Sequence, residues 1–280
     1  MKTLELLNFG SDKLRFKGVF SHQLDSELIL SKVLRKSREE IITNLDRKIT
    51  LRDAIRFHKF IKRRLKKEPI AYLLEEKEFW SKNFIVNKNT LIPRPETELM
   101  IDKIIKIYQK KSINILDIGT GSGCIIISLL GELENSSGVG VDISNKAILV
   151  AKKNKERNNI NNRLRLLKKS FKNIYNCKFD LIVSNPPYVD RRSLNRLDDD
   201  VRKYEPIIAL DGGKDGLDVI EKVIYKAKDL LKINGRLALE IGNKQFRQVS
   251  RILKRNNFKI EINIKDYEEN IRCIISNFKG

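Results

Sequence analysis

A short glycine-rich segment is a place where the chain could hold a ligand. It reads Asp-Ile-Gly-Thr-Gly-Ser-Gly over 117–123, directly after an apolar run and directly before a helical pattern. Glycines let a ligand approach the backbone, and the free N–H groups at a helix N-terminus attract carboxylates and phosphates. The position three after Gly121 is Cys124, so the spacing does not fit a nicotinamide fingerprint, and there is no P-loop lysine. The segment therefore indicates a binding loop for something other than a dinucleotide.

An acidic residue follows at a spacing that suits a nucleoside. Asp142 lies 19 positions after Gly123 and ends the run Gly-Val-Gly-Val-Asp. A carboxylate at this place can accept hydrogen bonds from both hydroxyls of a ribose. A nucleoside cofactor without a pyrophosphate fits both features, and S-adenosylmethionine is such a molecule. The alternative is an Asp that only caps the next helix.

A third candidate segment, Asn185-Pro186-Pro187-Tyr188, ends the apolar run 179–184. Ligands of open α/β sheets bind outside the carboxyl ends of the strands, so this tetrapeptide should face the same crevice as the glycine loop. The prolines lack N–H groups, which leaves carbonyl oxygens on a backbone of fixed φ, and Asn185 adds a side-chain oxygen. These acceptors suit the NH₂ group of a carboxamide or of a base amine, because holding both hydrogens directs the nitrogen lone pair at an electrophilic methyl group. Tyr188 could stack on the flat substrate or, in a purely structural alternative, fill the core.

We expect no metal site. His22 and His58 lie in helical patterns and have no partner at metal or triad spacing. The cysteines are odd in number and have apolar neighbours, which favours reduced thiols over disulfides; they are Cys124, Cys177 and Cys273.

Alternating strands and helices from residue 97 onward must position these segments. Apolar runs predict strands at 113–118, 138–143, 164–167, 179–184, 236–241, 259–264 and 272–278. Helical patterns cover 97–109, 122–133, 145–157, 216–232 and 244–256. The last two strands are joined by residues 265–271, too few for a crossover helix, so they should be antiparallel. The expected fold class is α/β: a Rossmann-like, doubly wound sheet with helices on both faces and an antiparallel last strand, the arrangement of class I methyltransferases.

The first part of the chain shows capped helices. Ser37 and Glu40 form a capping-box pair, Thr50 precedes another helical pattern, and Pro69 should end the last helix. Two β-like runs, 84–86 and 90–92, are joined by a turn-prone Asn-Lys-Asn and predict a hairpin. We expect a small helical domain over 1–75, a β-hairpin linker over 76–96 and a methyltransferase domain over 97–280.

Composition limits the class of protein. A length of 280 residues suggests roughly two domains, and 14 Gly and 6 Pro exclude collagen-like or Pro/Gly-rich disordered chains. No apolar run reaches the roughly 20 residues of a membrane-spanning helix, and the N-terminus does not resemble a signal peptide, so we expect a cytoplasmic protein without a membrane partner. The chain has 57 Lys and Arg against 36 Asp and Glu, a formal charge of +21. This excess indicates either a nucleic-acid partner or a general bias in composition, since only 59–67 forms a dense basic block.

Beyond these patterns, the chain resembles a known family over nearly its whole length. It is similar to the protein-(glutamine-N5) methyltransferases of peptide chain release factors, the PrmC/HemK family. Members of this family have a helical N-terminal domain followed by a class I methyltransferase domain that carries an Asn-Pro-Pro-Tyr motif. Further matching segments are 25–30 (DSELIL), 68–72 (EPIAY), 78–80 (EFW), 91–98 (LIPRPETE), 205–206 (EP), 209–213 (ALDGG), 215–218 (DGLD) and 239–242 (LEIG). The related ribosomal-protein enzyme usually carries Pro-Arg-Ser-Pro at the junction, so Pro93-Arg94-Pro95-Glu96 points to the release-factor branch.

The resemblance implies a role for each matching residue. The methionine part of S-adenosylmethionine would be bound by Gly119, Thr120, Gly121, Ser122 and Gly123. Asp142 would bind its ribose and Phe171 would stack on its adenine, although Phe171 could also be simple core packing. The substrate amide would be held by Asn185, Pro186, Pro187 and Tyr188. Of these, Asn185, Pro186 and Tyr188 are the expected catalytic residues, Asn185 also borders the cofactor, and Arg94 and Glu96 assist substrate binding.

The expected reaction is methyl transfer from S-adenosylmethionine to the side-chain amide of the glutamine in the Gly-Gly-Gln motif of class I release factors. Three positions depart from the family pattern: Ser170 stands where an Asp is frequent, and Glu75 and Glu269 stand where Gly is frequent. Alternatives are a nucleic-acid exocyclic-amine methyltransferase, a ribosomal-protein glutamine methyltransferase, and a non-catalytic ribosome-associated binding protein.

Overall fold

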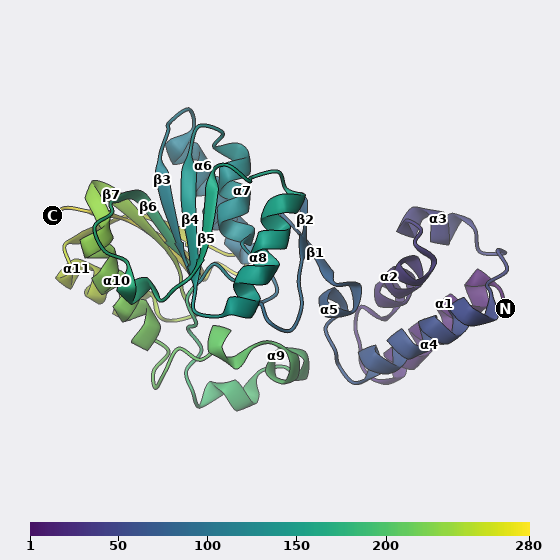
Figure 1. Cartoon of the computed structure of the whole chain (residues 1–280). Helices are drawn as coiled ribbons and strands as arrows, with labels where there is room; N and C mark the ends of the chain where they lie inside the picture. Colours follow the sequence, from purple (N-terminus) through teal and green to yellow (C-terminus); the bar gives the residue numbers. More distant parts are fainter. The chain divides into compact units, whose positions relative to one another are not determined.

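The computed structural model describes all residues, 1–280, and the chain divides into two compact units (Figure 1). Residues 1–76 and 198–204 form a helical unit, and residues 77–197 and 205–280 form a unit that carries the sheet. The domain boundaries expected from the sequence, 1–75, 76–96 and 97–280, stay a prediction.

The helical unit buries one apolar core between its helices. The helices are α1 (Thr3–Phe16), α2 (His22–Leu34), α3 (Arg38–Thr43), α4 (Leu51–Leu65), α5 (Ile70–Leu74) and α9 (Asp199–Tyr204). The predicted caps are confirmed: Ser37 and Glu40 form a reciprocal capping box, and Thr50 Oγ1 accepts from the Asp53 N–H at 3.1 Å. Pro69 was predicted to end the last helix, but it is the N-cap of a further short helix, α5, which has no clear signal in the sequence.

A buried ion pair holds two of these helices together. The Arg64 Nε atom in α4 donates to Asp25 Oδ2 in α2 at 2.6 Å, and the two side chains are 10% and 2% exposed. A buried charge is tolerated only with a partner of this kind, because leaving water costs each ion several kcal/mol. The Asp25-Ser26-Glu27-Leu28 motif therefore has a structural role in the helical unit.

The sheet unit contains seven strands in the order β5-β4-β3-β6-β7-β9-β8. Their bounds are β3 (Asn114–Ile118), β4 (Ser137–Asp142), β5 (Leu164–Lys168), β6 (Phe179–Ser184), β7 (Leu231–Glu240), β8 (Phe258–Lys265) and β9 (Ile271–Phe278). The five strands β3 to β7 are parallel, whereas β9 runs antiparallel to both β7 and β8. This confirms the predicted doubly wound sheet. The predicted strand bounds agree within one residue, except that β7 begins five residues earlier.

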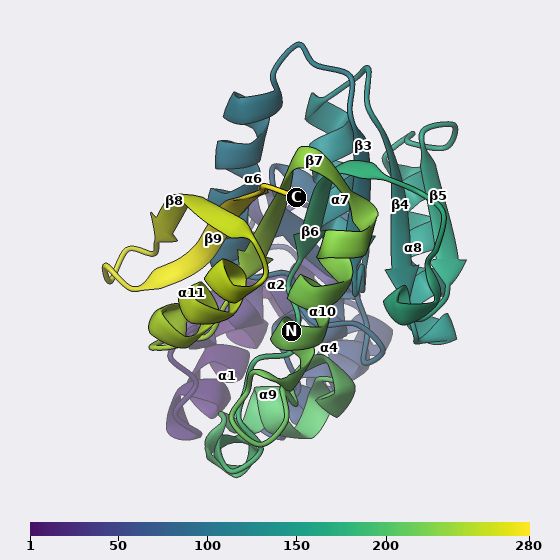
Figure 2. The same ribbon diagram turned by 90° about the vertical axis from the view of Figure 1, so that its left-hand side faces the viewer.

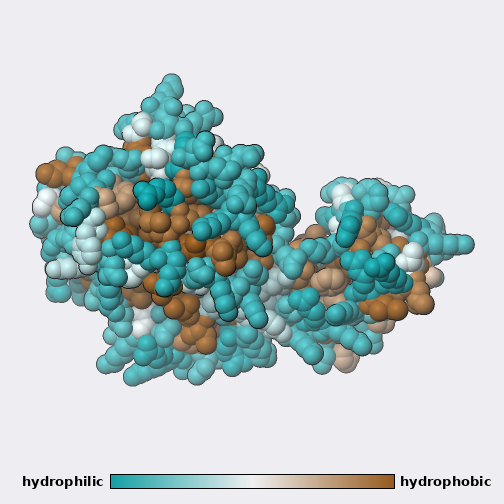
Figure 3. Space-filling model, viewed as in Figure 1, coloured by the Kyte–Doolittle hydropathy of each residue, from teal (hydrophilic) through white to brown (hydrophobic).

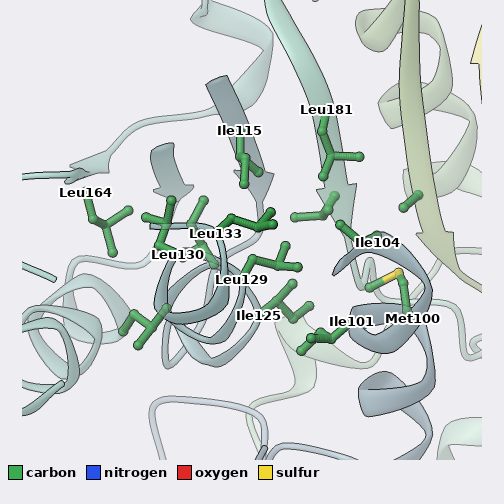
Figure 4. Packing of buried hydrophobic residues seen from close by; sticks show 14 of the residues in the cluster. Met100, Ile101, Ile104, Ile115, Ile125, Leu129, Leu130, Leu133, Leu164 and Leu181 are labelled. Atoms are coloured by element: carbon green, nitrogen blue, oxygen red, sulfur yellow. The ribbon is translucent and has the colours of Figure 1, made fainter. Parts of the chain in front are cut away.

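Two layers of helices cover the sheet (Figure 2). On one face lie α6 (Pro95–Tyr108), α7 (Cys124–Glu132) and α8 (Asn145–Arg157), and on the other lie α10 (Asp218–Leu230) and α11 (Phe246–Arg255). Figure 4 shows the first layer closely: Met100 and Ile104 from α6 and Leu129 from α7 pack toward Ile115 of β3 and Leu181 of β6. These side chains leave water completely, which provides much of the free energy that fixes the sheet and hence the ends of its strands.

The hairpin is real, but its predicted position was wrong. The strands are β1 (Glu76–Phe79) and β2 (Lys82–Ile85), joined by Trp80 and Ser81 at φ of 51° and 52°. Two residues of positive φ match a type I′ hairpin turn, which usually carries Asn-Gly. Here tertiary contacts hold the turn without Asn-Gly. The Trp80 N–H donates to Glu98 Oε1 at 2.8 Å, and the indole Nε1 of Trp80 donates to Glu132 Oε1 at 3.1 Å.

No helix of the chain is long and apolar enough to cross a membrane. The cysteines are free thiols, as predicted. The two histidines make local contacts: His22 Nδ1 lies 2.8 Å from Ser11 Oγ, and the His58 ring packs edge-on against Phe9.

The buried ion pair gives a first testable prediction. Asp25→Ala leaves the Arg64 guanidinium buried without its partner, so the free energy of unfolding of the helical unit should fall by about 3–5 kcal/mol. The double variant Asp25→Leu/Arg64→Met removes both charges and should recover most of the loss. Urea unfolding followed by far-UV circular dichroism measures both.

The exposed ion pair between Lys2 Nζ and Asp46 Oδ1, 2.8 Å apart, is the matched control. Asp46→Ala should change stability little, because solvent already screens that pair. A loss in Asp25→Ala no larger than in Asp46→Ala would contradict a structural role for the buried pair.

Candidate active site

A cavity of about 610 Å³ opens at the carboxyl ends of β3, β4 and β6. The structure thus brings the three predicted segments into one site. Predicted site residues that line the cavity are Gly119, Thr120, Gly121, Ser122, Asp142, Phe171, Asn185, Pro186, Pro187 and Arg94. Gly123, Tyr188 and Glu96 do not line it.

The glycine loop is built for close approach to its backbone. Gly119, Gly121 and Gly123 have φ of 75°, 55° and 81°, a region that side-chain-bearing residues rarely adopt. The N–H groups of Gly119 and Thr120 both donate to the Val141 carbonyl of β4, at 2.9 and 3.0 Å. The loop is therefore hydrogen-bonded to the neighbouring strand, while Gly119 and Gly121 stay open to a ligand.

Asp142 organises this loop from the end of β4. Its Oδ2 atom accepts from the Gly121 N–H at 3.0 Å and its Oδ1 atom accepts from the Ser144 N–H at 2.8 Å. Burial raises the pKa of the carboxyl, and these backbone hydrogen bonds oppose the rise. The helix-cap alternative is wrong for Asp142, because Ser144 caps α8 by accepting from the Ala147 N–H. A carboxylate offers more lone pairs than two N–H groups use, so Asp142 can also accept from a ligand hydroxyl.

The acceptor segment, residues 185–188, presents Asn185 to the cavity. The side-chain amide of Asn185 lines the cavity and hydrogen-bonds no other group of the protein. The carbonyl oxygens farther along the segment are already packed: Pro187 O lies against Gly212, where a Cβ would come within 2.8 Å, and Tyr188 O accepts from Gln245 Nε2 at 3.0 Å. The acceptors left for a ligand are therefore the Asn185 oxygen and the Pro186 carbonyl.

Two glycines let a neighbouring turn support this segment. A Cβ on Gly216 would come within 2.3 Å of Tyr188 O, and the Gly212 N–H donates to Val189 O at 2.8 Å. Only a residue without a side chain permits such an approach of two backbones. The turn that contains the Asp-Gly-Gly motif (211–213) and the Asp-Gly-Leu-Asp motif (215–218) thus supports the acceptor segment, and we call it the glycine brace.

Tyr188 sits behind the cavity in a buried polar cluster. Its hydroxyl donates to Glu240 Oε1 at 3.3 Å and accepts from Arg272 NH2 at 3.2 Å, and the guanidinium lies 5.7 Å from the ring centroid. Glu240 is fully buried and also accepts from Thr97 Oγ1 at 2.5 Å. Burial raises the pKa of the Tyr188 hydroxyl and of the Glu240 carboxyl. The cluster ties the acceptor segment to α6, β7 and β9, while stacking of Tyr188 on a substrate stays a prediction.

The junction motif at 93–98 borders the cavity through Arg94. The Arg94 guanidinium donates to Glu205 Oε1 at 2.6 Å, and Glu205 Oε2 accepts from the Ile92 N–H at 3.1 Å. This pair holds residues 206–209 at the rim of the cavity. The helix α6 begins at Pro95 with Arg94 as N-cap, two residues before the predicted start at 97, so Glu96 lies in the first turn.

Phe171 lies where both of its predicted roles are possible. It lines the cavity and also packs, half-buried, against the core on the α10 side of the sheet. Ile143, 50% exposed, lines the same cavity. Two apolar side chains in a cavity of this size suit a flat aromatic base.

Several supporting residues were missed from the sequence. Asn154 in α8 is fully buried and joins β2 to the glycine loop, since its Nδ2 atom donates to Ser122 O and Ile85 O, both at 2.9 Å. Gln245 joins Tyr188 O to Gly242, and Arg272 supports the Tyr188 hydroxyl. None of these belongs to a motif with an evident mechanism, so single-sequence reasoning had no signal for them.

The site residues fit S-adenosylmethionine. The open glycines could take its amino-acid part, the spare lone pairs of Asp142 its ribose, and the apolar walls its base. The chain holds no cluster of three His, Cys, Asp or Glu side chains able to bind a metal.

Two family models match the chain. The PrmC N-terminal domain matches residues 5–74, and a methyltransferase domain matches residues 109–274. Among curated relatives, the release factor glutamine methyltransferase of Clostridium botulinum is 38% identical, with 96% of this chain and 97% of that protein covered. The one of Fusobacterium nucleatum is also 38% identical, over 98% of this chain and 78% of that protein.

A longer relative also matches. The bifunctional methyltransferase of Rickettsia conorii is 37% identical over 97% of this chain, which spans only 57% of that protein's length. The fold is shared with solved structures of low identity. The catalytic domain of hMettl16 in complex with the MAT2A 3′UTR hairpin 6 has a TM-score of 0.60 at 17% identity, covering 83% of this chain and 87% of that one. A methyltransferase from Pyrococcus furiosus has a TM-score of 0.53 at 22% identity, covering 70% and 88%.

Asp117, directly below the glycine loop, generates a prediction about pH. Its Oδ2 atom accepts from Thr120 Oγ1 at 2.7 Å, its Oδ1 atom is buried without a partner, and burial raises its pKa from 3.8 to about 7. The folded chain therefore keeps a proton that the unfolded chain loses above about pH 4. The stability contributed by this proton is complete below about pH 4 and is lost as the pH rises to about 7.

We expect the wild type to lose about 2–3 kcal/mol of unfolding free energy relative to Asp117→Asn between about pH 5 and pH 8, because Asn cannot ionise. Urea unfolding of both proteins at the two pH values measures the difference. A difference that does not change with pH would show that Asp117 is ionised in the folded state throughout.

Proposed function

Since the chain belongs to the release factor glutamine methyltransferase family, we propose that it methylates the side-chain amide nitrogen of a glutamine in a class I peptide chain release factor. The methyl donor is S-adenosylmethionine, and the target is the glutamine of the Gly-Gly-Gln motif. The reaction takes place in the cytoplasm, where the release factor acts.

The observation that carries this proposal is the Asn185 side chain. It is a polar group without a protein partner, in the same cavity as a glycine loop of positive φ. A carboxamide NH₂ group has two hydrogens, and the Asn185 oxygen with the Pro186 carbonyl offers it two acceptors. A neutral amide needs no charged partner, which is consistent with the absence of an ionisable side chain from residues 184–187.

The acceptors act on the nitrogen lone pair. In a free amide the lone pair is delocalised into the carbonyl, and the nitrogen is a poor nucleophile. Two hydrogen bonds from its hydrogens hold the nitrogen in one orientation and favour the pyramidal form that develops during attack. Bound S-adenosylmethionine supplies a methyl group on a sulfonium. The new N–C bond forms as the C–S bond breaks, and the amide nitrogen then loses one proton to water.

Tyr188 is proposed as a positioning residue. The Glu240 and Arg272 contacts fix its ring and hydroxyl, and the backbone carbonyls beside it are held by Gln245 and the glycine brace. A segment with two prolines can form few backbone hydrogen bonds, so external contacts must set its geometry. Small displacements of the acceptors would misalign the nitrogen with the methyl group.

Choice of substrate requires a second surface. A pocket that reads only an amide cannot distinguish one glutamine from another, so selection must come from contacts farther away. The helical unit matches the PrmC N-terminal domain and carries the basic block at 59–67. We assign to it the recognition of the intact release factor.

A direct test uses purified class I release factor. Incubation with the full chain and S-adenosylmethionine should add the mass of one methyl group to the factor, located by peptide mass spectrometry on the Gly-Gly-Gln glutamine. An isolated Gly-Gly-Gln peptide should be a poor substrate. Asn185→Ala should reduce turnover by about 100-fold or more, since loss of one hydrogen bond to the transition state costs roughly 3 kcal/mol, and cofactor affinity should stay within about tenfold.

The same experiment tests the rival functions. Uptake of labelled methyl groups by RNA or DNA, with no mass gain in the release factor, would replace this proposal with a nucleic-acid amine methyltransferase. Methylation of a ribosomal protein alone would place the chain in the related ribosomal-protein branch. No methylation of any of these would support a binding protein without activity.

A further prediction concerns the buried polar cluster of Tyr188, Glu240 and Arg272. Tyr188→Phe keeps the ring but removes the partner of Glu240 Oε1 and Arg272 NH2, so we expect kcat to fall by about tenfold or more with little change in cofactor Kd. Single-turnover kinetics and calorimetry measure the two quantities.

Tyr108→Phe is the matched control. Tyr108 is also buried in the sheet unit, its hydroxyl donates to Asp180 O at 3.2 Å, and the Arg236 guanidinium lies 5.6 Å from its ring. This variant should lose about 1 kcal/mol of stability with turnover unchanged. Equal turnover in the two variants would remove the positioning role of Tyr188.

A further inference from the structure

One part of the sheet has no helix in front of it. The face of the sheet opposite α7 and α8 is covered by α10 and α11 over β6 to β9, whereas β4 and β5 have no helix in front of them on that side (Figure 2). The connection from β5 to β6, residues 169–178, contains only the short 3₁₀ turn Phe171–Asn173. A groove of about 520 Å³ lies there, and we call this region the open face.

The strand pattern shows how the open face arises. Leu164 and Leu166 of β5 belong to the buried core under α7 and α8. Successive side chains of a strand point to opposite sides, so Arg165 and Leu167 point to the open face, where both line the groove. Leu167 is 36% exposed. Parallel strands are normally covered on both sides, so a half-open β5 is a departure from the usual arrangement.

The charge on the open face has one sign. The groove is lined by four basic side chains, Arg163, Arg165, Lys169 and Lys178, and by no Asp or Glu. Arg163 NH1 donates to the carbonyls of Leu133 and Ser136, both at 3.1 Å, and Lys178 Nζ donates to Leu231 O at 3.3 Å. The side chains of Arg165 and Lys169 make no ion pair or hydrogen bond within the protein. All four charges therefore lack an acidic partner, and a polyanion would supply one.

An aromatic ring stands at the edge of this charge. Tyr175 lines the groove and is 65% exposed, and Lys226 Nζ lies 4.4 Å from its ring centroid. The cation–π contact holds the ring in place and leaves part of it open to solvent. Figure 3 shows that exposed apolar side chains occur on the sheet unit among mostly hydrophilic ones.

We propose that the open face binds single-stranded RNA, with the phosphates on the four basic side chains and a base against Tyr175. A phosphate backbone fits cations that have no acidic neighbours, and the exposed faces of unpaired bases fit an aromatic ring and an apolar floor. An acidic polypeptide would match the charge but not the aromatic edge. This binding is separate from the methylation of glutamine, and it gives part of the +21 charge a function.

The test is fluorescence anisotropy of a labelled single-stranded RNA of about 12 nucleotides with the full chain at several salt concentrations. Arg165→Glu/Lys178→Glu changes two side chains that line this groove and do not line the active-site cavity. We expect Kd to rise at least tenfold and the slope of log Kd against log salt to fall by about 1.4, since each phosphate contact on a single strand contributes about 0.7. Tyr175→Ala should weaken binding several-fold without a change in that slope.

Arg251→Glu/Lys254→Glu on α11 is the matched control, because both residues are exposed and the net charge changes equally. It should leave Kd within about threefold, and both double variants should methylate release factor at the wild-type rate and show wild-type circular dichroism. Equal weakening by the two double variants would mean that RNA responds only to overall charge, and would overturn the proposal. A chain that binds no RNA would also overturn the proposal. Displacement of the RNA by polyglutamate at equal charge concentration would overturn it as well, and would assign the open face to an acidic protein segment.

Discussion

The site depends on the acceptor segment, residues 185–188, whose backbone has too few N–H donors to fix its own position. Pro186 and Pro187 remove two N–H donors directly after β6, so the acceptor segment cannot continue as a strand of the sheet. Of the acceptors in the segment, the Asn185 side-chain oxygen and the Pro186 carbonyl stay available to a ligand. The position of this segment must then come from its surroundings. Gly212 and Gly216 approach it from one side, Gln245 holds Tyr188 O, and the Tyr188 side chain is anchored in the core.

The glycine loop, on another wall of the cavity, must also be held in place by contacts from outside the loop. Three of the five residues of the glycine loop, 119–123, have no side chain that could fix the backbone, and a flexible loop would lose binding affinity. Asp142 takes up the Gly121 N–H, the Val141 carbonyl takes up two others, and Asn154 fixes the Ser122 carbonyl. Asn154 also pairs with the Ile85 backbone in β2. The hairpin is thereby connected to the loop through one buried amide, so damage to either should affect the other.

Motif spacing predicted the sheet, its helices and the three segments of the site, because a strand that leads into a glycine turn and a helix has strong local signals. What the sequence could not predict depends on contacts distant in the chain. The Trp80-Ser81 turn lacks the usual Asn-Gly and is set by Glu98 and Glu132. The Tyr188 hydroxyl is turned away from the cavity by Glu240 and Arg272, which lie 52 and 84 positions further on. A motif gives the residue type at a position but not the direction of its side chain.

The β5 segment shows that a departure from pattern can itself be informative. Its sequence, Leu-Arg-Leu-Leu-Lys, alternates over its first three residues, whereas strands covered on both sides tend to be continuously apolar. An arginine in the middle of such a strand must reach water or find an acidic partner, because a buried unpaired charge is too costly. No acid lies opposite it in the groove, and the short β5–β6 connection leaves room for solvent. The uncovered strand and the unpaired Arg165 are thus consistent with each other. The charge of Arg165 requires access to solvent, and a face without a helix leaves this charge available to a partner.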